Sequence, residues 1–264
     1  MAAIGVWEAV AMRFHLNPDK WDGKLKPGEA HLWLVDLEQQ VSDVQTLWRV
    51  LSKDEMRRAE SFCFPGDQHS FVIARGLLRF LLAAYTHKQP EALQFSYNAN
   101  GKPCLSDGDA LPAFNIAHSD TYALYAICAN CHIGVDVERI RPFDGYLDIA
   151  RGHFTPEEYS QITSAPDDKR SELFFRYWTL KEAVVKALGV GIDRLPDFRL
   201  RLFEDGAADV QFLTTSLASD MRWYLRWFYP TKEFAGALAT IGFVQRVVAR
   251  ACPDLDSLIS YLSL

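Results

Sequence analysis

The chain has 264 residues, of which 49% are hydrophobic and 23% charged, enough to bury one large core or two smaller ones. The formal net charge is −6, without a basic tail or stripe, so we expect no nucleic-acid partner. No apolar run reaches the ~18 residues of a membrane span. No signal-peptide pattern opens the chain, and five cysteines is an odd number for a disulfide framework. We therefore expect a cytoplasmic protein without a membrane partner.

The first half predicts a strand, two helices and further strands. The expected strands cover 31–37, 94–97, 114–118 and 122–128. Ser52 and Glu55 match a capping box that begins a helix, and a second helix is expected from residue 71 to about 85. Asn100-Gly101 is a strong turn signal. We expect strand 122–128 to pair with strand 133–138 through a turn at residues 129–130.

The second half predicts the same order of elements. Thr155 and Glu158 match another capping box, with proline at the first helical position. A long helix follows, and then strands at 198–203, 210–214, 223–229 and 234–241. The matching order predicts an α+β fold of two similar lobes, joined near residues 129–142, each an antiparallel sheet packed with a long helix. We place the lobes at 1–131 and 132–264, with a site where they meet.

Acidic residues in two stretches suggest a cation site. In the strand 133–138, Asp136 and Glu138 point away from the alternating apolar residues, with Cα atoms about 6–7 Å apart. Two carboxylates on one strand face repel each other unless a cation lies between them. On the long helix, Glu182 and Lys186 stand four residues apart and lie side by side. A third carboxylate from this helix would complete an oxygen-rich site for an ion such as Mg²⁺.

Each of these motifs also has an ordinary structural interpretation. The strand acids could be the solvent face of an edge strand, and the helix pair could be a surface ion pair worth ~0.2–0.5 kcal/mol. Lys102 could be a solvent-exposed lysine in a hairpin turn or a phosphate or nucleobase contact. His118 could be a structural histidine or a phosphate donor, and Arg75 a snorkelling arginine.

Other familiar motifs are absent from the sequence. Cys128 and Cys131 form a lone C-x-x-C without a second pair at zinc spacing, so we interpret them as core or surface cysteines. There is no G-x-S-x-G, Walker loop or G-x-G-x-x-G, so nucleophilic-serine, P-loop and dinucleotide-binding functions lack support.

Four runs, taken in order, resemble the 4′-phosphopantetheinyl transferases of the larger, single-chain Sfp type: NGKP (100–103), FNIAHS (114–119), GVDVE (134–138) and FRYWTLKEAVVKALGVGI (175–192). Their order and spacing match from about residue 50 to 203. The resemblance implies lobes related by pseudo-twofold symmetry, a monomer, and coenzyme A and Mg²⁺ bound between the lobes. The implied reaction transfers phosphopantetheine from coenzyme A to a serine of an apo acyl or peptidyl carrier protein and releases adenosine 3′,5′-bisphosphate.

The resemblance also implies roles for the charged residues of the second half. By motif position, Asp136, Glu138 and Glu182 would hold the magnesium. Glu182, or a water that it orders, would be the base for the acceptor hydroxyl. Lys186 would neutralise the pyrophosphate, and Lys181 would support the acidic cluster or the phosphates.

In the first half, the resemblance implies contacts with the nucleotide end of coenzyme A, made by Arg58, Arg75, Lys102, His118 and Ser119. His118 would bind the 3′-phosphate. The sequence departs from the commonest pattern at Ala117, where many relatives have serine, so one hydroxyl contact to phosphate is missing.

Two other functions compete with this one. A catalytically silent module could bind coenzyme A or a carrier protein, although the presence of all three acids argues against lost catalysis. An unrelated magnesium-dependent phosphotransferase could have similar lobes, and it would turn over nucleoside triphosphates instead of coenzyme A.

Overall fold

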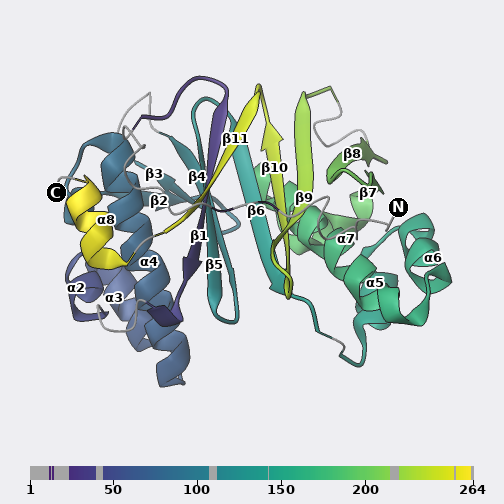
Figure 1. The fold of residues 1–264 in the computed structure, drawn as a ribbon, viewed down its shortest axis with the longest axis horizontal. Helices are drawn as coiled ribbons and strands as arrows, with labels where there is room; N and C mark the ends of the chain where they lie inside the picture. The colour runs from purple at the N-terminus through teal and green to yellow at the C-terminus, as the bar shows by residue number, and fades with distance from the viewer. Residues whose placement is uncertain are drawn as a thin grey trace, which may run out of the picture.

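The computed structural model describes residues 24–39, 44–106, 112–141, 143–214, 220–252 and 254–262, together with Met12 and Phe14. These residues form four layers, in the order helices, sheet, sheet, helices, which are seen edge-on in Figure 1. The predicted mixture of helices and mostly antiparallel sheets is confirmed. Within the described residues, none of the helices has the length and apolar character needed to cross a membrane.

The first sheet has the strand order β11-β1-β5-β4 and is covered by helices on its outer face. Its strands are β1 (Glu29–Asp36), β4 (Ala113–Ser119), β5 (Tyr122–Cys128) and β11 (Arg246–Ala251). The helices are α2 (Val44–Arg49), α3 (Lys53–Glu60), α4 (Pro65–Thr86) and α8 (Leu255–Leu262). A 3₁₀ turn, η3 (Pro90–Ala92), precedes the small hairpin of β2 (Phe95–Tyr97) and β3 (Pro103–Leu105), which has the predicted turn.

The second sheet has the order β6-β10-β9-β8-β7, and its helices cover the opposite outer face. Its strands are β6 (His132–Arg139), β7 (Phe198–Leu202), β8 (Ala207–Phe212), β9 (Trp223–Thr231) and β10 (Phe234–Ile241). The helices are α5 (Tyr146–His153), α6 (Pro156–Ser164) and α7 (Asp167–Leu188), followed by the 3₁₀ segment η4 (Ile192–Asp197).

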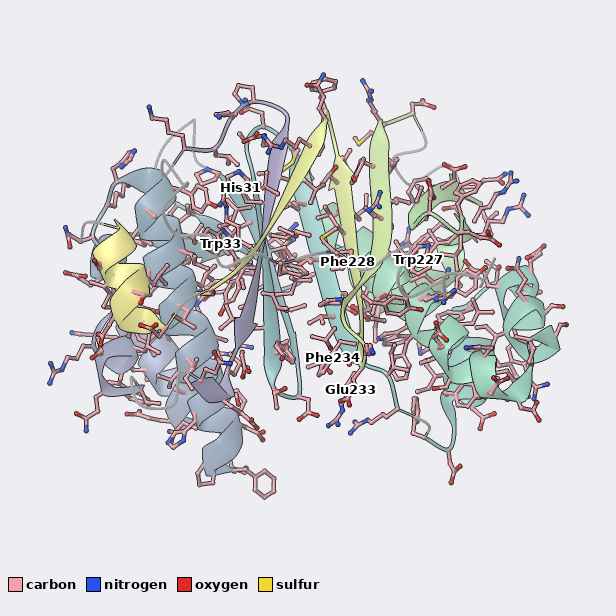
Figure 2. All side chains as sticks on the ribbon, viewed as in Figure 1. His31, Trp33, Trp227, Phe228, Glu233 and Phe234 are labelled. Carbon is pink, nitrogen blue, oxygen red and sulfur yellow. A yellow bond between two sulfur atoms is a disulfide. The ribbon has the colours of Figure 1, made fainter. Side chains whose placement is uncertain are left out.

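Alternating side chains on the strands fill three cores: one under each helical layer and one between the two sheets. Figure 2 shows this alternation on β9, where Trp227 points towards the helices and its neighbour Phe228 points towards the first sheet. On β1, Trp33 packs in the core beneath α4. The sheet-to-sheet core therefore joins the two halves of the chain into one body.

Both predicted capping boxes are present, and the first leads into a buried ion pair. Ser52 caps α3 and Glu55 completes the box, accepting from the backbone N of Ser52 at 2.8 Å. Glu55 is only 2% exposed and also accepts from Arg79 Nε on α4 at 2.7 Å. The Arg79 Nη1 in turn donates to the carbonyls of Pro90 and Leu93, at 2.7 and 3.0 Å.

The second capping box leads into an equivalent network. Glu158 completes the box with Thr155 at the start of α6 and lies 3.0 Å from Lys181 Nζ on α7. Lys181 donates to the carbonyls of Leu195 and Phe198, at 2.8 and 2.7 Å. In both halves, a capping-box glutamate holds a cation from the next long helix, and that cation binds carbonyls around a 3₁₀ segment. These matching networks support the predicted internal repeat.

The predicted pairing of strand 122–128 with strand 133–138 is wrong. β5 pairs with β1 and β4 in the first sheet, whereas β6 pairs with β10 in the second. The connection at Ala129 and Asn130 carries the chain from one sheet to the other instead of closing a hairpin. Cys128 and Cys131, which the sequence analysis interpreted as core or surface cysteines, flank this connection and form a disulfide that it did not predict.

The end of the described chain returns to the first sheet. β11 pairs parallel with β1, with Arg246 opposite Glu29, and α8 packs against α4. β11 and α8, which the sequence analysis assigned to the second lobe, therefore pack with the first. The division between residues 131 and 132 stays a prediction.

Candidate active site

The two acidic stretches meet where β6 packs on α7. Gly134 makes this close approach possible, because a Cβ at that position would lie 2.0 Å from the Ala183 carbonyl oxygen and 2.4 Å from the Ala187 nitrogen. Asp136 and Glu138 follow at two-residue intervals and so share the strand face that packs on α7. The glycine thus brings the strand acids to the helix.

Asp136, Glu182 and Lys186 form a charged cluster at this contact. Asp136 Oδ1 accepts from Lys186 Nζ at 2.6 Å, and Glu182 Oε2 lies 3.8 Å from the same ammonium. Burial raises the pKa of Asp136 to about 7 and also raises the pKa of Glu182; Lys186 opposes both shifts and Glu138 adds to them. Burial disfavours the Lys186 charge, but Asp136 and Glu182 outweigh it and raise the pKa of the ammonium. The carboxylate of β6 and the charged pair of α7 therefore lie side by side.

The first sheet contributes His118 and Ser119 from the end of β4. Ser119 Oγ donates to Glu138 Oε2 at 2.7 Å and accepts from the Arg139 backbone nitrogen at 3.2 Å. His118 is open to solvent, and partial desolvation and the nearby Lys186 charge lower the pKa of its imidazole. These contacts join the end of β4, in the first half of the chain, to β6, which carries Asp136 of the charged cluster.

Asn115 is a residue of this region that the sequence analysis missed. It is 5% exposed, and its Oδ1 accepts from the Val135 backbone nitrogen at 2.8 Å. β6 lies at the end of the second sheet, so this amide side chain supplies a partner that a neighbouring strand would otherwise provide. The bond ties β4 to β6 one residue before Asp136. An asparagine between Phe114 and Ile116 in an apolar strand was the available signal.

The structure corrects the prediction for Lys181. This residue is fully buried, and its ammonium has three partners: the Glu158 carboxylate and the carbonyls of Leu195 and Phe198. An ammonium has three N–H donors, so none is left for a phosphate or for the β6 acids. Lys181 instead joins α7 to α6 and to the start of β7.

The predicted first-half cations lie in different environments. Arg75 is buried, and its Nε donates to Glu55 Oε1 at 2.5 Å while its Nη2 donates to the Tyr97 hydroxyl at 2.8 Å. Arg58 is exposed, with its guanidinium 5.4 Å from the centre of the Phe71 ring. The guanidinium of Arg75 is thus engaged within the first half, whereas that of Arg58 faces solvent.

Lys102 contacts the backbone of both elements that carry the charged cluster, α7 and β6. Its Nζ donates to two carbonyl oxygens, that of Lys186 at 2.6 Å and that of Ile133 at 2.8 Å. Burial lowers the pKa of Lys102 to about 8. The predicted contact of this ammonium with the nucleotide therefore competes with two backbone bonds already in place.

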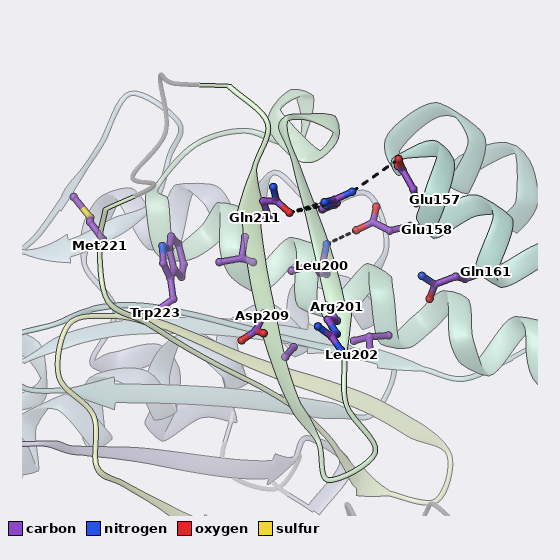
Figure 3. Close-up of a pocket in the computed structure, with 13 residues that line it drawn as sticks. Glu157, Glu158, Gln161, Leu200, Arg201, Leu202, Asp209, Gln211, Met221 and Trp223 are labelled. Carbon is purple, nitrogen blue, oxygen red and sulfur yellow. Dashed lines mark hydrogen bonds and ion pairs between the residues drawn. The ribbon is translucent and has the colours of Figure 1, made fainter.

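A cavity of about 870 Å³ lies elsewhere, between α6 and the β7–β8 hairpin. Figure 3 shows Glu157 and Gln161 on one side and Trp223 and Met221 on the other. None of the predicted site residues lines this cavity. We therefore do not assign the active site to this cavity, because a large volume alone does not indicate catalysis.

The acids at the β6–α7 contact were expected to hold a divalent cation. Within the described part of the chain, no three His, Cys, Asp or Glu side chains stand close enough together to hold a metal ion as they are placed. However, Asp136 Oδ2 is buried and has no hydrogen-bond partner, so this oxygen is available to a ligand. Together with Glu138 and Glu182 it offers the all-oxygen donor set that Mg²⁺ prefers.

Comparison with known proteins identifies the family. Residues 38–130 match a profile described as 4′-phosphopantetheinyl transferase, N-terminal, and residues 132–239 match the 4′-phosphopantetheinyl transferase superfamily. The 4′-phosphopantetheinyl transferase HetI of Nostoc sp. is 38% identical over 217 residues, which cover 81% of this chain and 89% of that protein. The chain belongs to the 4′-phosphopantetheinyl transferases.

Two Bacillus subtilis members of this family are also similar. The 4′-phosphopantetheinyl transferase ffp is 31% identical over 67% of this chain and 79% of that protein. The 4′-phosphopantetheinyl transferase Sfp of strain 168 is 29% identical over 61% of this chain and 70% of that protein. The resemblance to the Sfp type that the four sequence runs indicated is confirmed.

Proposed function

We propose that this chain transfers the 4′-phosphopantetheine group of coenzyme A to a serine of an apo acyl or peptidyl carrier protein, in the presence of Mg²⁺. The observation that carries the proposal is the cluster of Asp136, Glu182 and Lys186 at the β6–α7 contact, in a chain whose relatives are named as 4′-phosphopantetheinyl transferases.

The proposed reaction is a phosphoryl transfer. The serine hydroxyl attacks the β-phosphate of coenzyme A, and the bond from that phosphorus to the bridging oxygen breaks, so that adenosine 3′,5′-bisphosphate leaves. Glu182, directly or through a water, accepts the serine proton. Lys186 faces the leaving bisphosphate and balances its growing charge.

The cation would be held by Asp136, Glu138 and Glu182. Mg²⁺ bound there would neutralise charge on the phosphoryl oxygens. Ser119 holds Glu138 by a hydrogen bond at 2.7 Å, which limits the directions in which that carboxylate can point. The three acids come from a strand and a helix that Gly134 brings into close contact.

The nucleotide end of coenzyme A is proposed to lie towards β4 and the first half of the chain. His118 is exposed beside the cluster and would donate to the 3′-phosphate. Arg58 is a candidate for a further phosphate contact because its guanidinium faces solvent. Arg75 and Lys102 are weaker candidates, since their cationic groups already bind Glu55, Tyr97 and two carbonyls.

We also propose that the chain acts as a monomer. The apolar core between the two sheets already joins the two halves, so a second copy is not needed to assemble the contact between β4, β6 and α7.

The test is the intact mass of an apo acyl carrier protein and an apo peptidyl carrier protein after incubation with this chain, coenzyme A and Mg²⁺. A gain equal to one phosphopantetheine group that disappears with EDTA is the expected result. No gain on either carrier, with coenzyme A binding retained, would reject transfer and favour a silent binding module.

A further inference from the structure

The tip of the β2–β3 hairpin contacts the end of α7, although the two lie in different halves of the sequence. The side-chain nitrogens of Asn98 and Asn100 both donate to the Gly189 carbonyl, at 2.9 and 2.8 Å. Asn98 Oδ1 also accepts from the backbone nitrogens of Asn100 and Lys102 at 2.9 Å, so the same side chain shapes the turn. Gly189 ends α7 with φ 71°, and a Cβ there would lie 2.7 Å from Asn98 Nδ2.

Lys102 extends this contact to both elements of the charged cluster. Its ammonium donates to the carbonyl of Lys186 in the last turn of α7 and to the carbonyl of Ile133 on β6. The last carbonyls of a helix lack partners within the helix, and a cation is favourable beside them. Because Ile133 precedes Asp136 by three residues, one ammonium binds the backbone near both members of the Asp136–Lys186 pair.

We propose that Lys102, together with Asn98 and Asn100, positions the last turn of α7 against β6 so that Lys186 stays within reach of Asp136. This inference rests on the proposed function, and in it Lys102 acts through Lys186 instead of binding coenzyme A directly. Two of the three N–H groups of Lys102 are committed to carbonyls. The hairpin of the first half thereby controls the geometry of a helix of the second half.

Hydrogen exchange followed by mass spectrometry tests the contact without requiring activity. The variants are Lys102→Met and the double variant Asn98→Ala with Asn100→Ala; Lys53→Met, an exposed lysine of α3, is the matched control. We expect amides in residues 183–190 to exchange about tenfold faster or more in the first two variants than in wild type, and at the wild-type rate in Lys53→Met. Wild-type protection in both hairpin variants would overturn the proposal.

Steady-state kinetics below the unfolding temperature then test the positioning role. For both hairpin variants we expect kcat to fall about 10- to 100-fold while KM for coenzyme A changes less than about threefold. Because Asn98 and Asn100 are neutral, the same effect from both variants indicates position rather than charge. A raised KM with unchanged kcat, confined to Lys102→Met, would overturn the proposal in favour of direct coenzyme A binding.

The exchange result also separates this inference from the proposed function. If wild type transfers nothing to any carrier, the proposed function fails, and the protection of residues 183–190 still decides whether the hairpin holds the helix end. If wild type is active and the hairpin variants match it in both exchange and kcat, the positioning inference fails alone.

Discussion

The substitution Gly134→Ala tests whether the close approach of β6 and α7 assembles the charged cluster. The added Cβ would lie 2.0 Å from the Ala183 carbonyl oxygen, and ordinary contact begins at 3.4 Å, so the strand and helix must separate by about 1.4 Å. Both neighbouring atoms are backbone atoms, which cannot move aside by a change of rotamer. Overpacking of this kind costs about 1–3 kcal/mol of unfolding free energy.

The same separation should impair the chemistry. Asp136 follows Gly134 on the same strand face, and its bond to Lys186 is 2.6 Å long, so a shift of more than 1 Å takes the pair beyond hydrogen-bond distance. We expect a loss of about 100-fold in kcat/KM for transfer to a carrier protein. Gly152→Ala is the matched control, because a Cβ at this position on α5 meets nothing within 4 Å.

The stability of both variants is measured by urea unfolding, and their activity is measured by the transfer assay. The account predicts that Gly134→Ala loses stability and activity together and that Gly152→Ala keeps both. Wild-type stability and activity in Gly134→Ala would refute the reasoning, since the helix and strand could then not be as close as described.

Three further predictions follow from single residues. Asp136→Ala and Glu182→Gln should each abolish detectable transfer while circular dichroism shows the fold retained; wild-type turnover in either variant would contradict the assignment of these acids. Trp178 is half-buried and stacks on Phe174. Trp178→Ala should therefore lower the free energy of unfolding by about 2 kcal/mol, less than the same substitution of a fully buried tryptophan. An unchanged melting temperature would show that this packing does not stabilise the fold. Burial lowers the pKa of Lys102 from 10.5 to about 8 on folding, so the unfolded chain binds more protons than the folded protein between these pH values. The stability of wild type relative to Lys102→Met should therefore rise from pH 8 to pH 10.5. A difference in urea midpoints that does not change with pH would argue that Lys102 is not buried.

Features that depend on local sequence were predicted from the sequence. The capping boxes at Ser52 and Thr155 are formed by residues three positions apart, so their bonds follow from the local pattern alone. The two-residue period of β6 placed Asp136 and Glu138 on one face, and the four-residue spacing on α7 placed Glu182 beside Lys186.

Features that depend on distant partners were not predicted. β5 and β6 are adjacent in sequence and a hairpin was the natural expectation, but the partner of β6 is β10, about a hundred residues further along. The roles of Asn115 and Lys102 likewise depend on carbonyl and amide groups that only the tertiary fold brings to them.

Lys181 is a different case, because helical geometry already argued against its predicted role. At 100° per residue it lies about 140° around α7 from Lys186, whereas Glu182 lies about 40° away. The predicted role of Lys181 came only from its position in the family motif and not from helical geometry. Its actual partner, Glu158, is the counterpart of Glu55 in the first half.

The most direct test of the account is the intact mass of an apo carrier protein after incubation with coenzyme A, Mg²⁺ and either wild type, Asp136→Asn or the control Asp209→Asn. Asp209 is exposed on β8 beside the distant cavity. The account predicts one added phosphopantetheine group with wild type and Asp209→Asn, and none with Asp136→Asn. Equal modification by Asp136→Asn and wild type would contradict the claim that the transfer requires the acids at the β6–α7 contact.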